Sequence, residues 1–209
     1  MKCTAPYLGH STHICTDNSM YLVLEIIAVL LSLAFLILLI KEVKWCWPFG
    51  IVSSALSIAL FIEARLYSEA FLYLFYVIIG FYGWWVWTSN NAQKGEPLPV
   101  KRFSLGRAIL LFGLGTVGAY ALGATFERYT DAANPFLDAT STSFSFIASF
   151  LEAHKAISAW LYWIVINAIS IWLYLDRGLP IYSALMVVYL LVSVYGWFDW
   201  KNKWTKAIA

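Results

Sequence analysis

The stretch Tyr82-Gly83-Trp84-Trp85-Val86-Trp87 occurs a second time in this sequence, as Tyr195-Gly196-Trp197-Phe198-Asp199-Trp200. The same offset of 113 residues aligns 47–87 with 160–200 without a gap, and 14 of the 41 aligned residues are identical. Self-similarity at a fixed offset is evidence of a repeated structural unit. We therefore infer that the chain contains an internal duplication.

The composition is that of a membrane protein. Of the 209 residues, 61% are hydrophobic and 12% are charged, and the mean hydropathy is +0.71. Soluble domains contain about half apolar and a quarter charged residues. These values exclude a disordered chain, a disulfide scaffold and an ordinary soluble enzyme. A formal charge of +2, without basic runs outside the segment ends, argues against nucleic-acid binding.

Seven segments are predicted to cross the membrane as helices, which takes about 20 mainly apolar residues each. They are 21–40, 47–62, 70–87, 107–126, 136–151, 159–175 and 180–200. The fifth is weaker, because it is rich in Ser and Thr. A β-strand interpretation fails, because the runs are too long and lack period-two alternation. The first 20 residues are polar, so no cleavable signal peptide is expected.

The duplication predicts an all-α fold of two parallel three-helix bundles, residues 21–88 and 136–200. Residues 89–135 supply a linker with the fourth crossing, and 1–20 and 201–209 are tails. Three crossings would invert the second bundle, and the fourth restores its orientation. In such parallel repeats a substrate site is expected near the midplane, at the interface between the repeats.

The fourth segment carries small residues on its faces: Gly113, Gly115, Gly118, Ala119 and Gly123. Small residues four apart allow close helix packing in membranes. The pattern fits packing within the chain and also an interface between subunits, and both interpretations stay open here.

The distribution of positive charge predicts the orientation. With the N-terminus on one side of the membrane, that side receives four Lys and Arg residues and the other receives ten. The richer side is expected to be cytoplasmic. This places the C-terminus in the cytoplasm and the N-terminus outside.

Polar side chains form matching stripes on the second and sixth segments: Gly50, Ser54, Ser57 and Phe61, and Trp163, Asn167, Ser170 and Tyr174. A buried amide needs hydrogen-bond partners, so Asn167 is expected to contact either a neighbouring helix or a ligand. Tyr76 and Tyr189 lie mid-span at equivalent positions in the repeat. They are expected either to line a central path, with Tyr182 and Ser193 nearby, or to bond helices together.

Nine Trp residues fall near the predicted cytoplasmic surface, where aromatic belts are common: Trp45, Trp47, Trp84, Trp85, Trp87, Trp160, Trp197, Trp200 and Trp204. We assign Trp45, Trp85 and Trp204 to such a belt. For Trp84 and Trp197 a gate or pocket role stays open. The candidate substrate-binding residues are therefore Trp163, Asn167, Ser170, Tyr76, Tyr189, Ser54, Ser57, Trp47, Tyr82, Trp84, Tyr195 and Trp197.

Intramembrane charge is scarce, with Glu25 and Glu152 near segment ends and His154 and Lys155 in a loop where solvated charge is expected. Coupled transporters usually hold ionisable groups at mid-depth, so an uncoupled path is favoured. The predicted site is an aromatic, hydroxyl- and amide-lined cavity without strong negative charge. It suits a small flat ring that carries a sugar or side chain, including a cationic one. No catalytic motif is present, which argues against an enzyme.

The polar head of the chain contains Cys3, His10, His13 and Cys15. Their spacing is too loose to favour a metal site, so none is predicted. A disulfide between the two cysteines would require the head to lie outside the cytosol.

The run Trp47-Pro48-Phe49-Gly50-Ile51, together with the two copies of the duplicated motif, resembles the PnuC vitamin transporters of bacteria over residues 20–204. The resemblance implies a SWEET-like fold, no cofactor, a homotrimer and facilitated diffusion of nicotinamide riboside. A cytoplasmic riboside kinase would trap the substrate by phosphorylation. Other members carry thiamine, riboflavin or deoxynucleosides. The polar head does not match the family.

The resulting hypothesis is a nicotinamide riboside transporter of the bacterial inner membrane. Transport of thiamine is the first alternative, followed by riboflavin or a deoxynucleoside. A membrane sensor or assembly subunit that binds a vitamin without transporting it is an alternative from another class.

Overall fold

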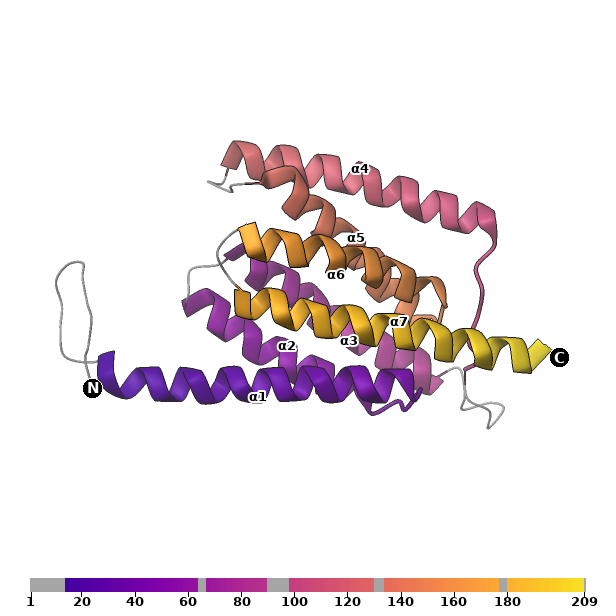
Figure 1. The fold of residues 1–209 in the computed structure, drawn as a ribbon, viewed down its shortest axis with the longest axis horizontal. Helices are drawn as coiled ribbons and strands as arrows, with labels where there is room; N and C mark the ends of the chain where they lie inside the picture. The colour runs from indigo at the N-terminus through magenta and orange to yellow at the C-terminus, as the bar shows by residue number, and fades with distance from the viewer. Residues whose placement is uncertain (1–13, 64–66, 90–97, 130–133, 177–179, 209) are drawn as a thin grey trace.

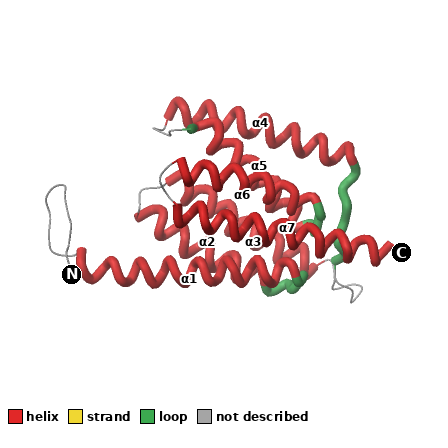
Figure 2. Tube along the Cα trace, in the orientation of Figure 1, coloured by secondary structure: helices red, strands yellow, loops and turns green. Residues whose placement is uncertain are grey.

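The computed structural model describes residues 14–63, 67–89, 98–129, 134–176 and 180–208. Seven α-helices form within them (Figure 2): α1 (Ile14–Ile40), α2 (Cys46–Glu63), α3 (Tyr67–Ser89), α4 (Leu105–Tyr129), α5 (Pro135–Ala153), α6 (Ser158–Asp176) and α7 (Pro180–Ile208). Each predicted crossing lies inside one of these helices, which confirms the all-α prediction.

Each helix is slightly longer than its predicted crossing, and the largest extensions are at the start of α1, which begins at Ile14, and at the end of α7, which ends at Ile208. The last turns of α7 contain Lys201, Lys203 and Lys206, and lysine is a good helix former. Lys203 also pairs with Asp199 one turn earlier, with 2.7 Å between Nζ and Oδ2. Helix-forming lysines and an ion pair between residues four apart both stabilise a helix, so α7 continues through this charged segment.

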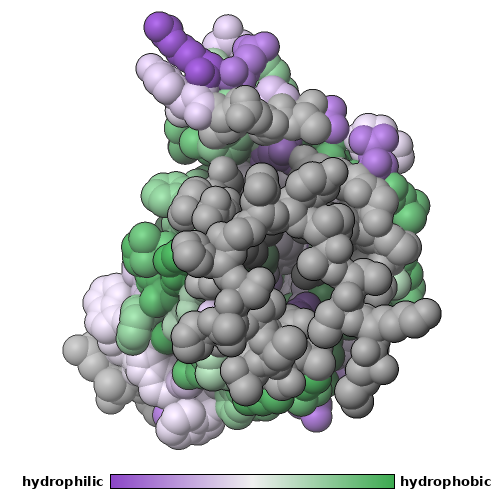
Figure 3. Space-filling model, turned by 90° about the vertical axis from the view of Figure 1, so that its left-hand side faces the viewer, coloured by the Kyte–Doolittle hydropathy of each residue, from purple (hydrophilic) through white to green (hydrophobic). Residues whose placement is uncertain are grey.

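The helices differ in how well they could cross a membrane alone. By length and composition, suitable spans occur in α1, α3, α4 and α7: Val23–Ile40, Glu69–Ser89, Leu105–Tyr129 and Ser183–Ala207. The apolar parts of α2 and α6 are shorter, and α5 contains six Ser and Thr residues. Helices α3, α4 and α6 pack around α5, so its hydroxyls face protein. Hydrophobic side chains gather on the flanks of the bundle (Figure 3).

The two bundles run in the same direction, as the duplication predicts. In Figure 1, α1, α3, α5 and α7 run one way, and α2, α4 and α6 run the other. Helix α2 packs between α1 and α3, and α6 packs between α5 and α7. Contacts of α3 with α5 and of α1 with α7 close these six helices into a ring, and α4 packs outside it against α5.

Helix α4 uses its small residues to approach α5. Gly115 faces the ring of Phe144 and the side chain of Ile147, and Gly118 faces Ser143. The Ser143 hydroxyl donates to the Gly115 carbonyl oxygen at 2.9 Å. These residues pack within the chain, while the opposite face of α4 exposes apolar side chains, among them Ile109, Leu110, Val117 and Tyr120. The homotrimer stays a prediction.

The loops after α1 and α5 have the same unusual backbone geometry. Glu42 and Lys155 occupy equivalent positions in the repeat, and both adopt left-handed conformations with φ of 59° and 51°. In each loop the amide of the next residue donates a hydrogen bond to the carbonyl oxygen five residues earlier. These bonds join Val43 to Leu38 and Ala156 to Leu151, both at 2.9 Å. This is the Schellman helix ending, which usually takes glycine. A non-glycine residue there is strained by about 1–2 kcal/mol.

Those two strained residues form an ion pair with each other across the bundles. Lys155 Nζ lies 2.8 Å from Glu42 Oε2, and only 2% of the lysine side chain is exposed. Lys203 Nζ binds the other oxygen at 3.0 Å. Burial alone would raise the pKa of Glu42, but the hydrogen bonds and charges of the two lysines lower it below its ordinary value. The prediction that Lys155 is solvated is wrong, because the ends of both bundles cover it.

Indole rings complete this junction with two-fold regularity. Trp87 donates its Nε1 hydrogen to the Ala153 carbonyl oxygen at 3.0 Å, and Trp200 donates to that of Ile40 at 3.3 Å. Trp47 packs edge-on against Trp87, and Trp160 packs in the same way against Trp200. All four Trp residues are at most 3% exposed. The belt assignment fits the exposed Trp45 and Trp85, whereas Trp204 is half-buried and packs against the hydrophobic core here. We name these four residues with Glu42 and Lys155 the closing cluster.

Replacing Glu42 is expected to destabilise the protein, because Lys155 would remain buried without a carboxylate. We expect Glu42→Gln to lower the free energy of unfolding by about 3 kcal/mol, measured as a lower thermal midpoint in detergent. Lys203→Met is the control with a smaller effect, because Glu42 keeps Lys155. Equal losses in both variants would contradict this assignment.

The duplicated motif needs its glycines, because they admit a Trp ring. A methyl group on Gly83 would overlap the ring of Trp47, whereas one on Gly113 of α4 meets no atom within 4 Å. We expect Gly83→Ala to cost about 1–3 kcal/mol and Gly113→Ala to be neutral or stabilising. Thermal unfolding of both variants in the same detergent measures this. A Gly83→Ala protein as stable as the wild type would refute the packing argument.

Candidate functional site

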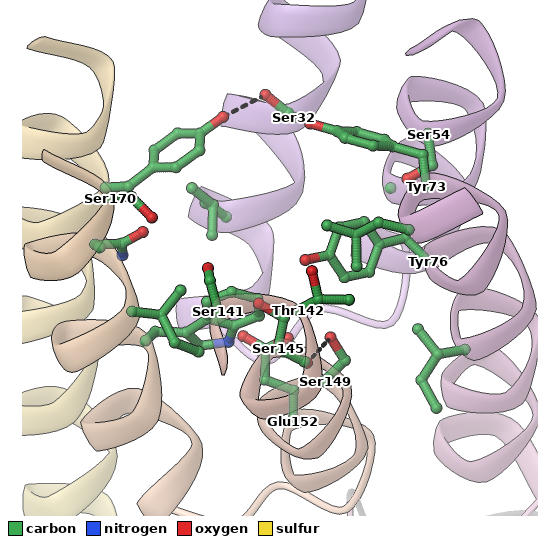
Figure 4. Close-up of a pocket in the computed structure, with 18 of the residues that line it drawn as sticks. Ser32, Ser54, Tyr73, Tyr76, Ser141, Thr142, Ser145, Ser149, Glu152 and Ser170 are labelled. Carbon is green, nitrogen blue, oxygen red and sulfur yellow. Dashed lines mark hydrogen bonds between the residues drawn. The ribbon is translucent and has the colours of Figure 1, made fainter. Parts of the chain in front are cut away.

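A cavity of about 300 Å³ lies between the two bundles (Figure 4). Glu152 lines it together with Trp47 and Trp160 of the closing cluster, and Glu69 and Asp138 line it toward the opposite end. Every helix contributes at least one lining residue, although α4 contributes only Phe126. The packed indoles thus close the cavity at the end of the bundle that holds Lys155 and the lysines of α7, which we call the Lys-rich end. The cavity extends from there toward the opposite end.

The lining follows the duplication. Several pairs of residues that are equivalent in the repeat line the cavity together: Ser32 and Ser145, Trp47 and Trp160, Gly50 and Trp163, Ser54 and Asn167, and Tyr76 and Tyr189. The cavity therefore lies on the axis that relates the two bundles. This is where the sequence places a substrate site.

Asn167 belongs to a buried hydrogen-bonded network inside the second bundle. Its side chain is 5% exposed, and its amide nitrogen donates to Ser193 Oγ at 3.2 Å. Ser193 Oγ in turn donates to the Tyr189 carbonyl oxygen at 2.8 Å. Asn167 thus satisfies an interhelical bond and also lines the cavity. The two interpretations of this residue are compatible.

Tyr189 links the bundles through its hydroxyl. The oxygen lies 2.9 Å from Ser32 Oγ of α1, and Ser32 Oγ also donates to the Val29 carbonyl oxygen. On the other side Tyr76 packs edge-on against Tyr73, with ring centroids 5.4 Å apart. Tyr189 thus joins α7 to α1 at the cavity, and Tyr76 lines the same cavity from α3 (Figure 4).

Helix α5 supplies a row of hydroxyls that the sequence analysis did not select. Ser141, Thr142, Ser145 and Ser149 line the cavity (Figure 4). Three of them are four residues apart, which puts them on one face of a helix. That spacing in an otherwise apolar crossing was a usable signal.

The cavity contains carboxylates, contrary to prediction. Glu152 is 4% exposed and lines its closed end, and Glu69 and Asp138 line it farther out. Among its described lining residues there is no Lys, Arg or His. Glu152 was expected near the end of a crossing. It lies inside because the loop after α5 is covered by the 98–104 segment, where the Lys101 amide binds the Lys155 carbonyl oxygen.

Trp163 lies beside Glu152. Its indole N–H is close to the carboxylate, yet it has no well-formed hydrogen-bond partner in the part of the chain that the structure describes. The equivalent residue in the first bundle is Gly50, which lines the same cavity and packs against the ring of Phe35. An aromatic surface next to a carboxylate can hold a flat cationic ring.

Seven of the twelve candidate residues line the cavity: Trp163, Asn167, Ser170, Tyr76, Tyr189, Ser54 and Trp47. Of the other five, Ser57 is buried outside it. Tyr82 stacks on Phe150, with its hydroxyl 3.2 Å from His154 Nε2. Trp84 and Trp197 pack against the closing cluster, and Tyr195 is 63% exposed. The side chains of Tyr174 and Tyr182, and of Cys3, His10, His13 and Cys15, lie outside the described residues.

Comparison with known proteins gives a consistent picture. A family model described as a nicotinamide mononucleotide transporter matches residues 22–202. The chain is 24% identical over 178 residues to the nicotinamide riboside transporter PnuC of Escherichia coli (strain K12), with 74% of each chain covered. It is 27% identical over 164 residues to that of Neisseria mucosa, which covers 73% of this chain and 62% of the relative.

The fold has also been seen in a solved structure. A crystal structure of the vitamin B3 transporter PnuC matches 95% of both chains with a TM-score of 0.72 and 23% identity. This likeness confirms the arrangement of the seven helices.

Proposed function

The chain belongs to the nicotinamide mononucleotide transporter family, and from this premise we propose that it carries nicotinamide riboside across the bacterial inner membrane by facilitated diffusion. The family consists of transporters, and the chain is a multi-pass membrane protein and not an enzyme. The observation that carries the proposal is the cavity on the repeat axis, with Trp163, Asn167 and Glu152 on its wall.

The charge of the cavity favours a riboside over a mononucleotide. A phosphate group is usually held by Arg, Lys or a helix N-terminus, and the described lining residues include no cationic side chain. They include the buried carboxylate of Glu152, which would repel a phosphate and attract the pyridinium ring of nicotinamide riboside. Thiamine is also cationic, so it remains the first alternative substrate.

We assign roles by position in the cavity. Trp163 would stack on the pyridinium ring, and Asn167 and Ser170 would hydrogen-bond to its polar groups. Tyr76, Tyr189 and Ser54 face the same space and would contact the ribose, whose hydroxyls match their own. Trp47 would form part of the floor. A cavity of about 300 Å³ lies at the lower end of the usual range for small-molecule sites.

Alternating access would require the closing cluster to open. The Lys-rich end is the cytoplasmic one by the positive-inside rule, so the cavity as described would face outward. Release to the cytoplasm would break the Glu42–Lys155 ion pair and the two bonds from Trp87 and Trp200. Trp84 and Trp197 pack beside these groups and would move with them as part of the gate.

Uptake into liposomes tests the mechanism. We expect purified protein to accumulate labelled nicotinamide riboside only in liposomes that contain a riboside kinase and ATP, and to equilibrate it otherwise. Because Glu152 lines the cavity, proton coupling is the mechanistic alternative, and uptake that collapses with a protonophore would favour it. Binding without any flux would favour the sensor or assembly subunit, and tighter binding of thiamine would favour a thiamine transporter.

Substitution of Trp163 tests the site. Loss of one stacked aromatic ring costs about 1–3 kcal/mol, so Trp163→Ala is expected to weaken nicotinamide riboside binding about ten- to hundredfold, measured by calorimetry in detergent. Trp172→Ala is the matched control, because Trp172 lies on the same helix and is 56% exposed outside the cavity. Equal affinity of the two variants would place the substrate elsewhere.

A further inference from the structure

Glu152 is a buried carboxylate in the wall of a cavity. It lies in the last turns of α5, is 4% exposed, and is the carboxylate that lines the end of the cavity next to Trp47 and Trp160. Removing a carboxylate from water is costly unless it is paired or well hydrogen-bonded. Its presence therefore needs an explanation.

The fold itself does not require a carboxylate at this position. The equivalent residue in the first bundle is Leu39, which is fully buried against the same closing cluster. The loops that follow both residues have the same Schellman geometry, with Glu42 and Lys155 at corresponding places. A leucine thus fills this position in the first bundle, so the fold does not need a carboxylate there. The carboxylate of Glu152 in the second bundle is instead part of the cavity wall.

No cation in the described structure neutralises Glu152. The nearest lysine in sequence, Lys155, directs its Nζ away to Glu42 at 2.8 Å and over the ring of Trp87 at 4.4 Å. The polar group that lies near the Glu152 carboxylate is the indole N–H of Trp163, which carries no charge. The carboxylate is thus available to a cation that enters the cavity.

We propose that Glu152 is the residue by which the cavity selects a positively charged ring over an uncharged ring of the same shape. This inference rests on the proposed function and deepens it. A pyridinium ring stacked on Trp163 would bring its positive charge next to the carboxylate, in a site largely removed from water. There an opposite charge is stabilised far more than at an exposed surface.

A pair of ligands that differ in charge but hardly in shape tests this role. Nicotinamide riboside carries a pyridinium cation, and its 1,4-dihydro form is uncharged. The measured quantity is the ratio of their dissociation constants for the full-length protein in detergent. We expect wild-type protein to prefer the cation, and Glu152→Gln to reduce that preference about ten- to hundredfold, the size of effect that one nearby opposite charge produces.

Three further variants separate charge selection from folding. Glu152→Asp keeps the charge and should retain the preference, whereas Glu152→Leu copies Leu39, should fold, and should lose it. Glu127→Gln removes a carboxylate from the exposed face of α4, outside the cavity, and should leave the ratio unchanged. A ratio is used because a merely structural role would weaken binding of both ligands equally.

The outcomes distinguish this inference from the function on which it rests. Wild-type protein that binds neither form would refute the proposed function and this inference with it. Wild-type protein that binds both, together with a Glu152→Gln variant of unchanged preference, would overturn only the inference. An unchanged preference in Glu152→Leu would overturn it as well, independently of the glutamine variant.

Discussion

The structure depends on a single junction between two strained loops. Glu42 and Lys155 take up left-handed conformations at equivalent ends of α1 and α5, and their side chains pair across the interface at 2.8 Å. The indoles of Trp87 and Trp200 reach from each bundle to a carbonyl of the other. Because these bonds are buried, breaking one would leave a polar group without water to replace the lost partner. The closing cluster thus holds the two bundles together at one end, in addition to the contacts of α3 with α5 and of α1 with α7.

Closure at one end produces the cavity. Contacts of α1 with α7 and of α3 with α5 complete the ring of six helices, and the closing cluster seals its Lys-rich end. The cavity lies on the axis that relates the two bundles, and equivalent residues from both bundles line it. Duplication thus explains the place and shape of the site through backbone geometry alone.

The chemistry of the site is less symmetric than its fold. Gly50, Ser54 and Leu39 in the first bundle correspond to Trp163, Asn167 and Glu152 in the second. At these three pairs of positions the second bundle carries the ring, the amide and the charge, and the first carries small or apolar residues. Helix α5 adds its row of hydroxyls, which lipid would not tolerate. The shielding of α5 by α3, α4 and α6 is what allows the cavity to be this polar.

The sequence by itself determined the seven helices and the parallel bundles. Run length, hydrophobic content and the offset of 113 residues are properties that local pattern records directly. It also selected Trp163 and Asn167, because a polar stripe in an apolar helix must face protein, and Tyr76 and Tyr189, because they lie mid-span at equivalent positions of the repeat. Only the tertiary structure decided that Lys155 is paired, that Trp87 and Trp200 bond across the bundles, and that Glu152 lines the cavity. A Trp or a charge at a helix end has the same local pattern whether it faces lipid headgroups, water or a second bundle. What separates these cases is which distant segment packs against it.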